Sequence, residues 1–212
     1  DESTIRAILD WDATPDLTAM LKFELGKFDV LGRQVEIVND QPSTTLPGNP
    51  TYSQALTAPP PNGFGADASV LNTTQDYKRS SNGDYSNNRT RNVTLNVDYA
   101  LGESTLTFIT GFLHYEFDEL CDCDFTGAPV FSVPFEEDYD QYSQEIRWVS
   151  AAGGTLEHIG GLYFQKSELD FFDAIVIDSN ILPAAVAQLT GSPAQGGSIA
   201  NTTTPRNFTS DA

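Results

Sequence analysis

Segments with the pattern of β-strands occur in pairs along this chain, and the connections between them alternate between very short and very long. The pairs span about residues 4–27, 92–117 and 141–165, and a handful of residues joins the two strands of each pair. The long connections are rich in Asn, Asp, Ser, Thr, Pro and Gly, which favour turns and loops. They span about residues 28–91, 118–140 and 166–212. This order predicts an all-β fold: an antiparallel up-and-down sheet of about six strands, with the short turns at one end and the long loops at the other.

The predicted strands alternate between polar and apolar side chains, as half-buried strands do. Ile146 and Trp148 share one face of the fifth strand, and Arg147 lies on the other. A turn centred on Ala152 would place Arg147 opposite Glu157 as a cross-strand ion pair. The same logic pairs Trp148 with Leu156, Leu101 with Leu106, Leu95 with Phe112, Trp11 with Leu17 and Ile5 with Phe23. Each hairpin is therefore expected to have one polar and one apolar face.

Three aromatic side chains, Trp11, Tyr99 and Trp148, lie on the apolar face within a few residues of a short turn. Aromatic girdles occupy this position at the membrane interfaces of outer-membrane barrels. The same residues would also cap the core of a soluble β-sandwich. The distribution of the turns favours the transmembrane β-barrel, because such barrels combine short turns on one side with long loops on the other.

Composition narrows the possible functions. With 11 basic and 30 acidic residues, the chain has a formal charge of −19, which excludes a nucleic-acid binder that neutralises phosphates. It also argues against docking on anionic lipid through a basic patch. No stretch approaches the roughly 20 apolar residues of a spanning helix, so a membrane role requires strands. The chain begins in mid-pattern at Asp1 and ends within a loop, and we expect it to be an excerpt of a longer protein.

The segment DQYSQEIRWVSAAGGTLEHIGGLYFQ, residues 140–165, resembles the barrel motif of TonB-dependent outer-membrane receptors. In that motif a Ser-Gln-Glu-(Leu/Ile)-Arg strand precedes a Gly-rich turn and a strand that ends in Gly-Leu-Tyr-Tyr or similar. The matching positions are Ser143, Gln144, Glu145, Ile146, Arg147, Gly153, Gly154, Gly161, Leu162, Tyr163 and Phe164. VTLNVDYALGESTLTFITGF and IRAILDWDATPDLTAMLKFE resemble the two preceding hairpins of such receptors, in the same order.

The resemblance implies part of a barrel of about 22 strands around a plug. It would lie in the bacterial outer membrane, with short periplasmic turns and long extracellular loops. Such receptors take up a scarce nutrient, an iron–siderophore complex, cobalamin or a glycan, with energy supplied through TonB. The implied partners are outer-membrane lipid, a small-molecule or glycan ligand, and the receptor's own plug domain and TonB, both outside this chain. The alternative is a secreted β-sandwich adhesin or lectin-like binding module whose apolar face is a dry core.

Two sets of residues describe the expected faces. The set expected to contact lipid is Ile5, Leu9, Trp11, Leu21, Phe23, Leu95, Val97, Tyr99, Phe108, Ile146 and Trp148. The set expected to line the lumen or touch the plug is Arg6, Lys22, Glu24, Asn96, Asp98, Glu145, Arg147 and Glu157.

Ligand contacts are expected on the long loops, because recognition residues cluster on loops carried by a rigid scaffold. The aromatic candidates for stacking on a sugar or a catecholate are Tyr52, Phe64, Tyr77 and Tyr85. The alternative is that these rings pack the first loop onto itself. In the third loop, residues 182–189 are predicted to form a short helix, either a lid or a packing element.

The second loop is acidic and contains the only candidates for cation binding. They are Asp118, Asp122, Asp124, Glu136 and Glu137. Oxygen-rich clusters suit Ca²⁺, but Val133 stands where an EF-hand loop requires a bidentate Glu, so a solvated acidic loop is the simpler interpretation. Cys121 and Cys123 would pair with cysteines elsewhere, bind a soft metal or form a strained local disulfide.

An enzymatic function finds little support in the sequence. His114 and His158 are far apart, and neither lies in a metal-ligand or nucleophile motif. Glu145 and Glu157 resemble a glycosidase pair only in residue type, and the strand pattern explains both as lumen-facing polar groups. We therefore expect neither an enzyme nor a resident metal or cofactor.

Overall fold

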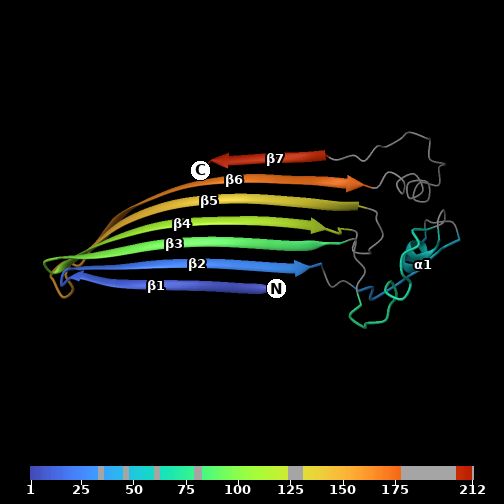
Figure 1. Cartoon of the computed structure of the whole chain (residues 1–212), viewed down its shortest axis with the longest axis horizontal. Coiled ribbons are helices and arrows are strands. Elements are labelled where there is room, and N and C mark those ends of the chain that lie inside the picture. Colours follow the sequence, from blue (N-terminus) through green and yellow to red (C-terminus); the bar gives the residue numbers. More distant parts are fainter. Residues whose placement is uncertain are drawn as a thin grey trace.

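The computed structural model describes residues 1–32, 36–44, 48–59, 63–78, 83–123, 131–177 and, by its backbone alone, 204–211. Its body is one antiparallel sheet of seven strands that lie in sequence order (Figure 1). The strands are β1 (Glu2–Thr14), β2 (Leu17–Leu31), β3 (Tyr85–Leu101), β4 (Ser104–Cys121), β5 (Phe131–Val149), β6 (Ile159–Ile177) and β7 (Thr204–Asp211). The predicted all-β, up-and-down arrangement is confirmed. The sheet is not closed, because β1 and β7 lie at its opposite edges.

The strands are much longer than the sequence pattern predicts. Strands β3 to β6 contain 17 to 19 residues each. At about 3.4 Å per residue, strands of this length extend roughly 60 Å. A strand of only about 10 residues is long enough to cross a membrane. Residues expected in the long loops extend the strands: 28–31 and 85–91 of the first loop belong to β2 and β3, and 118–121 and 131–140 of the second belong to β4 and β5. Residues 166–177 and 204–211, expected in the third loop, belong to β6 and to a seventh strand, β7. Residues 182–189, expected to be helical, lie outside the described part of the chain.

The predicted pairings are wrong by two residues in the first two hairpins. Trp11 lies opposite Ala19, because the register of β1 shifts just before the turn. Leu101 lies opposite Ser104, because Gly102, with a φ of 62°, opens a two-residue turn. A slip of two residues leaves every side chain on its predicted face, since strands alternate with a period of two.

The predicted ion pair between Arg147 and Glu157 is wrong. Strand β6 begins two residues after Glu157, and Arg147 lies opposite Gly161. The Glu157 carboxylate instead accepts a hydrogen bond from the Gly153 N–H at 2.5 Å, which closes a longer turn. Arg147 donates from Nε to Glu145, its neighbour on the same face of β5, at 2.7 Å.

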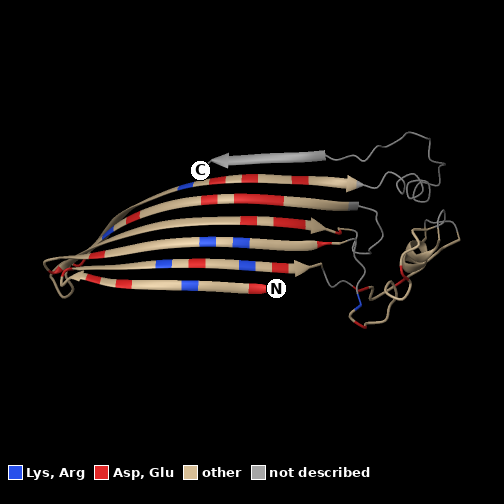
Figure 2. Cartoon of the chain, viewed as in Figure 1, with Lys and Arg blue, Asp and Glu red and all other residues tan. Residues whose placement is uncertain are grey.

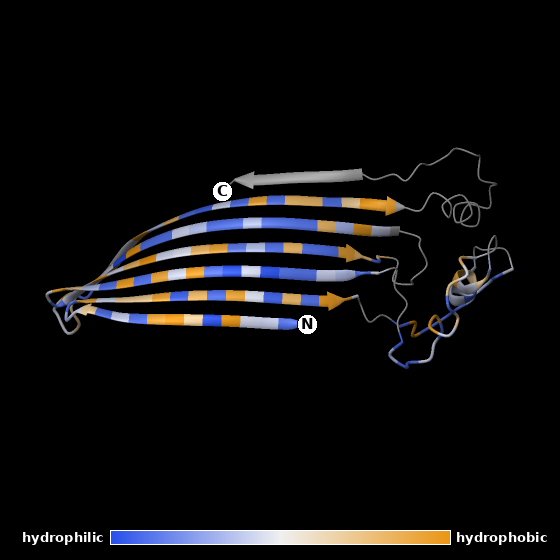
Figure 3. Ribbon diagram, in the orientation of Figure 1, coloured by the Kyte–Doolittle hydropathy of each residue, from blue (hydrophilic) through white to orange (hydrophobic). Residues whose placement is uncertain are grey.

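The register defines two faces that differ in exposure. We call the side that carries Trp11, Tyr99 and Trp148 face A, and the opposite side face B. The half of face A nearest the short turns is mostly apolar, and we call its apolar residues the apolar band. They are Leu9, Trp11, Leu21, Phe23, Val93, Leu95, Val97, Tyr99, Leu101, Leu106, Phe108, Phe112, Tyr142, Ile146, Trp148, Leu162 and Phe164. Two polar residues lie among them, Thr110 and Gln144, and the Thr110 hydroxyl donates to the Gln144 side chain at 2.8 Å. None of these side chains is buried: most are exposed, Trp11 by 63% and Leu162 by 77%, and the others are half-buried. Figure 3 shows the underlying alternation along β1 to β6.

Beyond the apolar band, the two faces exchange polarity. Face A becomes a charged belt, whose members are Lys27, Asp29, Arg89, Arg91, His114, Glu116, Asp118, Glu136, Asp138, Asp140, Glu168 and Asp170. Figure 2 shows basic residues on β2 and β3 and most of the acidic residues of this half of the sheet on β4 to β6. On β2, β4, β5 and β6, face B changes in the opposite sense, from polar near the turns to apolar and aromatic near the long loops, whereas on β3 it stays polar.

The first long loop forms a small folded unit. Its helix α1 (Tyr52–Thr57) begins at a capping box: the Thr51 hydroxyl accepts from the Gln54 N–H at 3.3 Å, and the Gln54 side chain accepts from the Thr51 N–H at 3.0 Å. Leu56 and Leu71 form a buried core beneath it. Among the described residues, no helix is long and apolar enough to cross a membrane.

Candidate functional site

An aromatic patch occupies face B in the half of the sheet nearest the long loops. Tyr115 of β4 lies directly opposite Tyr139 of β5, and their rings stack with centroids 5.2 Å apart and an interplanar angle of 27°. Phe135 and Phe171 add a second pair of rings, 6.4 Å apart and tilted by 46°. The patch comprises Phe28, Tyr115, Phe117, Phe135, Tyr139, Leu169 and Phe171.

Hydrogen bonds and nearby charges shape what this patch can bind. The Tyr115 hydroxyl donates to Glu137 at 2.9 Å, and the Tyr139 hydroxyl donates to Gln141 at 2.8 Å, which anchors both rings. Glu119, Glu137 and Asp173 lie on the same face. Ring faces and carboxylates both repel anions and attract cations. The arrangement therefore suits a neutral or positively charged ligand with a planar or apolar surface.

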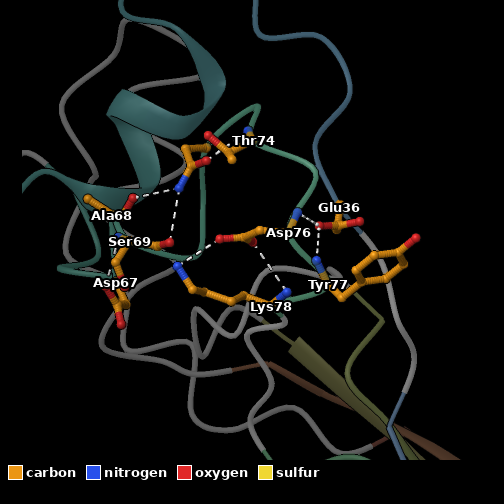
Figure 4. A network of polar contacts seen from close by, with 9 residues as sticks. Glu36, Asp67, Ala68, Ser69, Thr74, Asp76, Tyr77 and Lys78 are labelled. Atoms are coloured by element: carbon orange, nitrogen blue, oxygen red, sulfur yellow. Dashed lines mark hydrogen bonds and ion pairs between the residues drawn. The ribbon is translucent and has the colours of Figure 1, made fainter.

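The most exposed of the predicted loop aromatics is Tyr77, which is held by a polar network (Figure 4). It is 87% exposed and has a φ of 59°, which is unusual for a residue other than glycine. The Glu36 carboxylate fixes this conformation, since it accepts from the backbone N–H groups of Asp76 and Tyr77, both at 2.8 Å. A hydrogen bond from Lys78 lowers the pKa of Asp76 below its ordinary value. Tyr77 is thus an aromatic ring displayed to solvent on a fixed backbone.

The structure does not gather the other three loop aromatics into one site. Tyr52 is 51% exposed on α1. Phe64 packs against the core formed by Leu56 and Leu71, the packing role that the sequence left open. Tyr85 begins β3 and donates a hydrogen bond to Asp118 at 3.1 Å.

The acidic candidates for cation binding lie in different places. Asp118 and Glu136 are directly opposite each other on face A. Glu137 lies on face B, so it cannot share an ion with that pair. Asp122 is 5% exposed at the end of β4, and Asp124 lies outside the described residues.

The two cysteines form the local disulfide, one of the alternatives that the sequence allows. Cys121 ends β4 and is 2% exposed, and its Cα lies 5.1 Å from that of Cys123. The bridge closes a small ring where the chain leaves the sheet.

Sequence reasoning missed the aromatic patch because the acidic composition of residues 118–140 indicated a loop. The signal that identifies it is the alternation of Phe135, Glu137 and Tyr139 with charged neighbours. Comparisons of the chain with protein-family models, curated proteins and solved structures give no match. The assignment of function therefore depends on the two faces of the sheet.

Proposed function

We propose that this chain forms part of the transmembrane barrel of a TonB-dependent receptor in the bacterial outer membrane. The receptor would take up a scarce nutrient, an iron–siderophore complex, cobalamin or a glycan, with energy supplied through TonB. One observation carries the proposal: the apolar band lies uncovered across six neighbouring strands, with aromatic rings at its turn end and charges at its loop end.

The dimensions of the apolar band support this assignment. Along β3 it runs from Val93 to Leu101, about 27 Å at 3.4 Å per residue. A strand tilt of about 40° reduces this to a height of roughly 20 Å, near the roughly 25 Å of outer-membrane barrels. Trp11 and Trp148 lie at the turn end, where interfacial aromatic residues belong. The charged belt then falls outside the lipid.

Energetics also favour lipid as the covering of face A. Full burial of a large apolar side chain contributes about 1.5–3 kcal/mol, so a band of this size is too unfavourable to leave in water. Lipid covers it without any further protein. A soluble β-sandwich would need a second sheet over face A, and the described residues form only one sheet. For this reason we prefer the membrane barrel to the adhesin or lectin-like module.

The open edges of the sheet require further strands in the membrane. Unpaired backbone groups on β1 and β7 would be costly in lipid, because each lacks a hydrogen-bond partner there. Additional strands of a longer protein would close the barrel, and the polar half of face B would then face the lumen and the plug. The aromatic patch and Tyr77 are our candidates for the ligand contacts at the extracellular end.

Extraction tests the membrane assignment. The full-length protein should remain with the outer membrane until detergent is added, and should migrate differently on a gel before and after heating. Release into detergent-free buffer would instead support the soluble module.

Nutrient uptake tests the aromatic patch. The double variant Tyr115→Ala and Tyr139→Ala should lose uptake while the protein still reaches the cell surface. Tyr163→Ala is the matched control, because Tyr163 is on face B near the turns, outside the patch. Equal uptake in both variants would remove the patch from the binding site.

A further inference from the structure

Four polar side chains on face A form a square just beyond the apolar band. His114 and Glu116 lie two residues apart on β4, and Asp138 and Asp140 lie two residues apart on β5. The register places His114 opposite Asp140 and Glu116 opposite Asp138. We call these four residues the His114 cluster. Because both strands belong to the continuous ladder of the sheet, the backbone holds the four positions in fixed relation.

The distances within the His114 cluster match those of a metal centre. Asp140 Oδ1 lies 2.9 Å from His114 Nδ1, and Glu116 Oε1 lies 3.3 Å from His114 Nε2. If Nδ1–H donates to Asp140, the Nε2 lone pair is left to bind a metal, and a carboxylate in this position commonly orients metal-binding imidazoles. Tetrahedral zinc, with bonds of about 2.0–2.1 Å, separates its ligand atoms by about 3.3 Å.

Asp138 completes the set of ligands. His114, Glu116 and Asp138 each offer one ligand atom, and these atoms all lie within 4.8 Å of one another. Asp138 Oδ1 lies 3.8 Å from His114 Nδ1, so the Asp138 side chain has to rotate to reach an ion bound at Nε2. The side chain of Asp138 is 57% exposed, which leaves it free to rotate toward an ion, whereas that of His114 is only 14% exposed and is held in place. Water would supply the fourth ligand, as in zinc sites with three protein ligands.

The charge around the His114 cluster favours a cation. Like charges lie directly opposite each other in two rows: Glu116, Asp138 and Asp170 in one, and Asp140 and Glu168 in the other. Such pairs are destabilising unless a counter-charge is present. Arg89 and Arg91 approach Glu116 at 3.8 and 3.7 Å, and Lys166 lies two residues from Glu168 on the same face. Among the described residues, no Lys or Arg forms an ion pair with Asp138 or Asp140.

We propose that His114, Glu116 and Asp138 bind a divalent transition metal ion of the Zn²⁺ class, with Asp140 positioning the imidazole. An imidazole with carboxylates suits zinc, whereas Ca²⁺ and Mg²⁺ prefer oxygen ligands alone. The site lies on the opposite face from the aromatic patch. It does not depend on the proposed transport function, since the ion would cross-link β4 and β5 whatever covers the apolar band.

Calorimetric titration of the purified full-length protein with Zn²⁺ tests the site. We expect one saturable site that His114→Gln and Glu116→Gln each weaken at least tenfold. Asp140→Asn should weaken it about 10- to 100-fold, the usual effect of losing the group that orients a ligating imidazole. His158→Gln is the matched control, because His158 is the other histidine of the chain and packs edge-on against Trp148, with centroids 4.9 Å apart.

Two further measurements keep the result unambiguous. Bound Co²⁺ should give the intense visible absorption of a four-coordinate site in the unmodified protein and in His158→Gln, but not in Glu116→Gln. The β-sheet circular dichroism spectrum checks that each variant is folded, whether or not the protein is a membrane barrel. If His114→Gln fails to fold, Glu116→Gln provides the test. No saturable Zn²⁺ binding, or binding that survives loss of His114 or Glu116 in a folded variant, would overturn the proposal.

Discussion

Substitution of Leu95 by arginine tests the lipid contact of face A most directly. Leu95 lies in the middle rows of the apolar band, opposite Leu21 and Thr110, and is 38% exposed. A basic side chain at the bilayer midplane costs about 2–4 kcal/mol, which is a factor of about 30 to 900 in the folding equilibrium. Near the interface the same substitution costs only about 0–1 kcal/mol. We therefore expect Leu95→Arg to be far more destabilising than Leu101→Arg, at the turn end of the same face.

Asn96 supplies the matched control for this experiment. It is the next residue along β3 but lies on face B, where its side chain donates to Asp98 at 2.9 Å. Asn96→Arg should be nearly neutral, since the new cation would lie beside that carboxylate. The assay is refolding of the full-length protein into phosphatidylcholine vesicles, with urea titration followed by tryptophan fluorescence. Equal costs at positions 95 and 101, or no cost at position 95, would refute a depth-dependent lipid contact.

Three further predictions address packing, pH and the first loop. Gly161→Ala should lower the free energy of unfolding by about 1–3 kcal/mol in a urea titration, because a Cβ there would lie 2.6 Å from a backbone carbonyl oxygen of β5. Gly160→Ala is the control: a Cβ there meets open space, so stability should change by less than about 0.5 kcal/mol. Burial alone would raise the pKa of Asp40, but hydrogen bonds, led by that from Ser53, lower this pKa below its ordinary value. The ionised Asp40 carboxylate therefore stabilises the fold above about pH 3.9, and this stabilisation is lost on further acidification. Hydrogen exchange of the Ser53 amide, which donates to Asp40, should detect the loss, and Asp40→Asn should abolish this pH dependence. Deletion of residues 42–80 should leave a surface-exposed, heat-modifiable protein, because the free energy of loop closure changes by only about 0.6 kcal/mol per doubling of length. Uptake should be altered if the loop carries ligand contacts. Failure to assemble would mean that the loop packs structurally.

The strand order and the two faces could be predicted from the sequence because both depend on local patterns. Alternation with a period of two assigned Trp11, Tyr99 and Trp148 to one face, and a register error of two residues does not change that assignment. The registers themselves depend on backbone conformation in the turns. Gly102 shortens one turn through its positive φ, and Glu157 lengthens another by binding a backbone N–H. Neither effect can be derived from polarity alone.

The candidate sites were harder to predict because polarity reverses along β2, β4, β5 and β6. Between residues 131 and 140, acidic side chains alternate with rings, but the rings fall on the face that is polar nearer the turns. A search for one continuous apolar face therefore ends the second hairpin near residue 117 and assigns residues 118–140 to a loop. His114 gave no signal by itself, since its neighbours Asp138 and Asp140 are more than 20 residues away in sequence and become adjacent only through the register of β4 and β5.

Polarity reverses at about the same level on neighbouring strands. This reversal has a physical explanation if the strands are longer than a membrane is thick. Near the turns, lipid would cover face A and the lumen would lie on face B, so the apolar residues belong on face A. Beyond the lipid, face A of such a barrel would meet water and would have to be polar. Face B would then be the face on which rings can be buried and hold the strands together, as the stacked rings of Tyr115 and Tyr139 would do. A soluble sheet with one dry core has no reason to move its apolar residues from one face to the other halfway along β2, β4, β5 and β6. The reversal is therefore the feature that most strongly separates a membrane barrel from a β-sandwich.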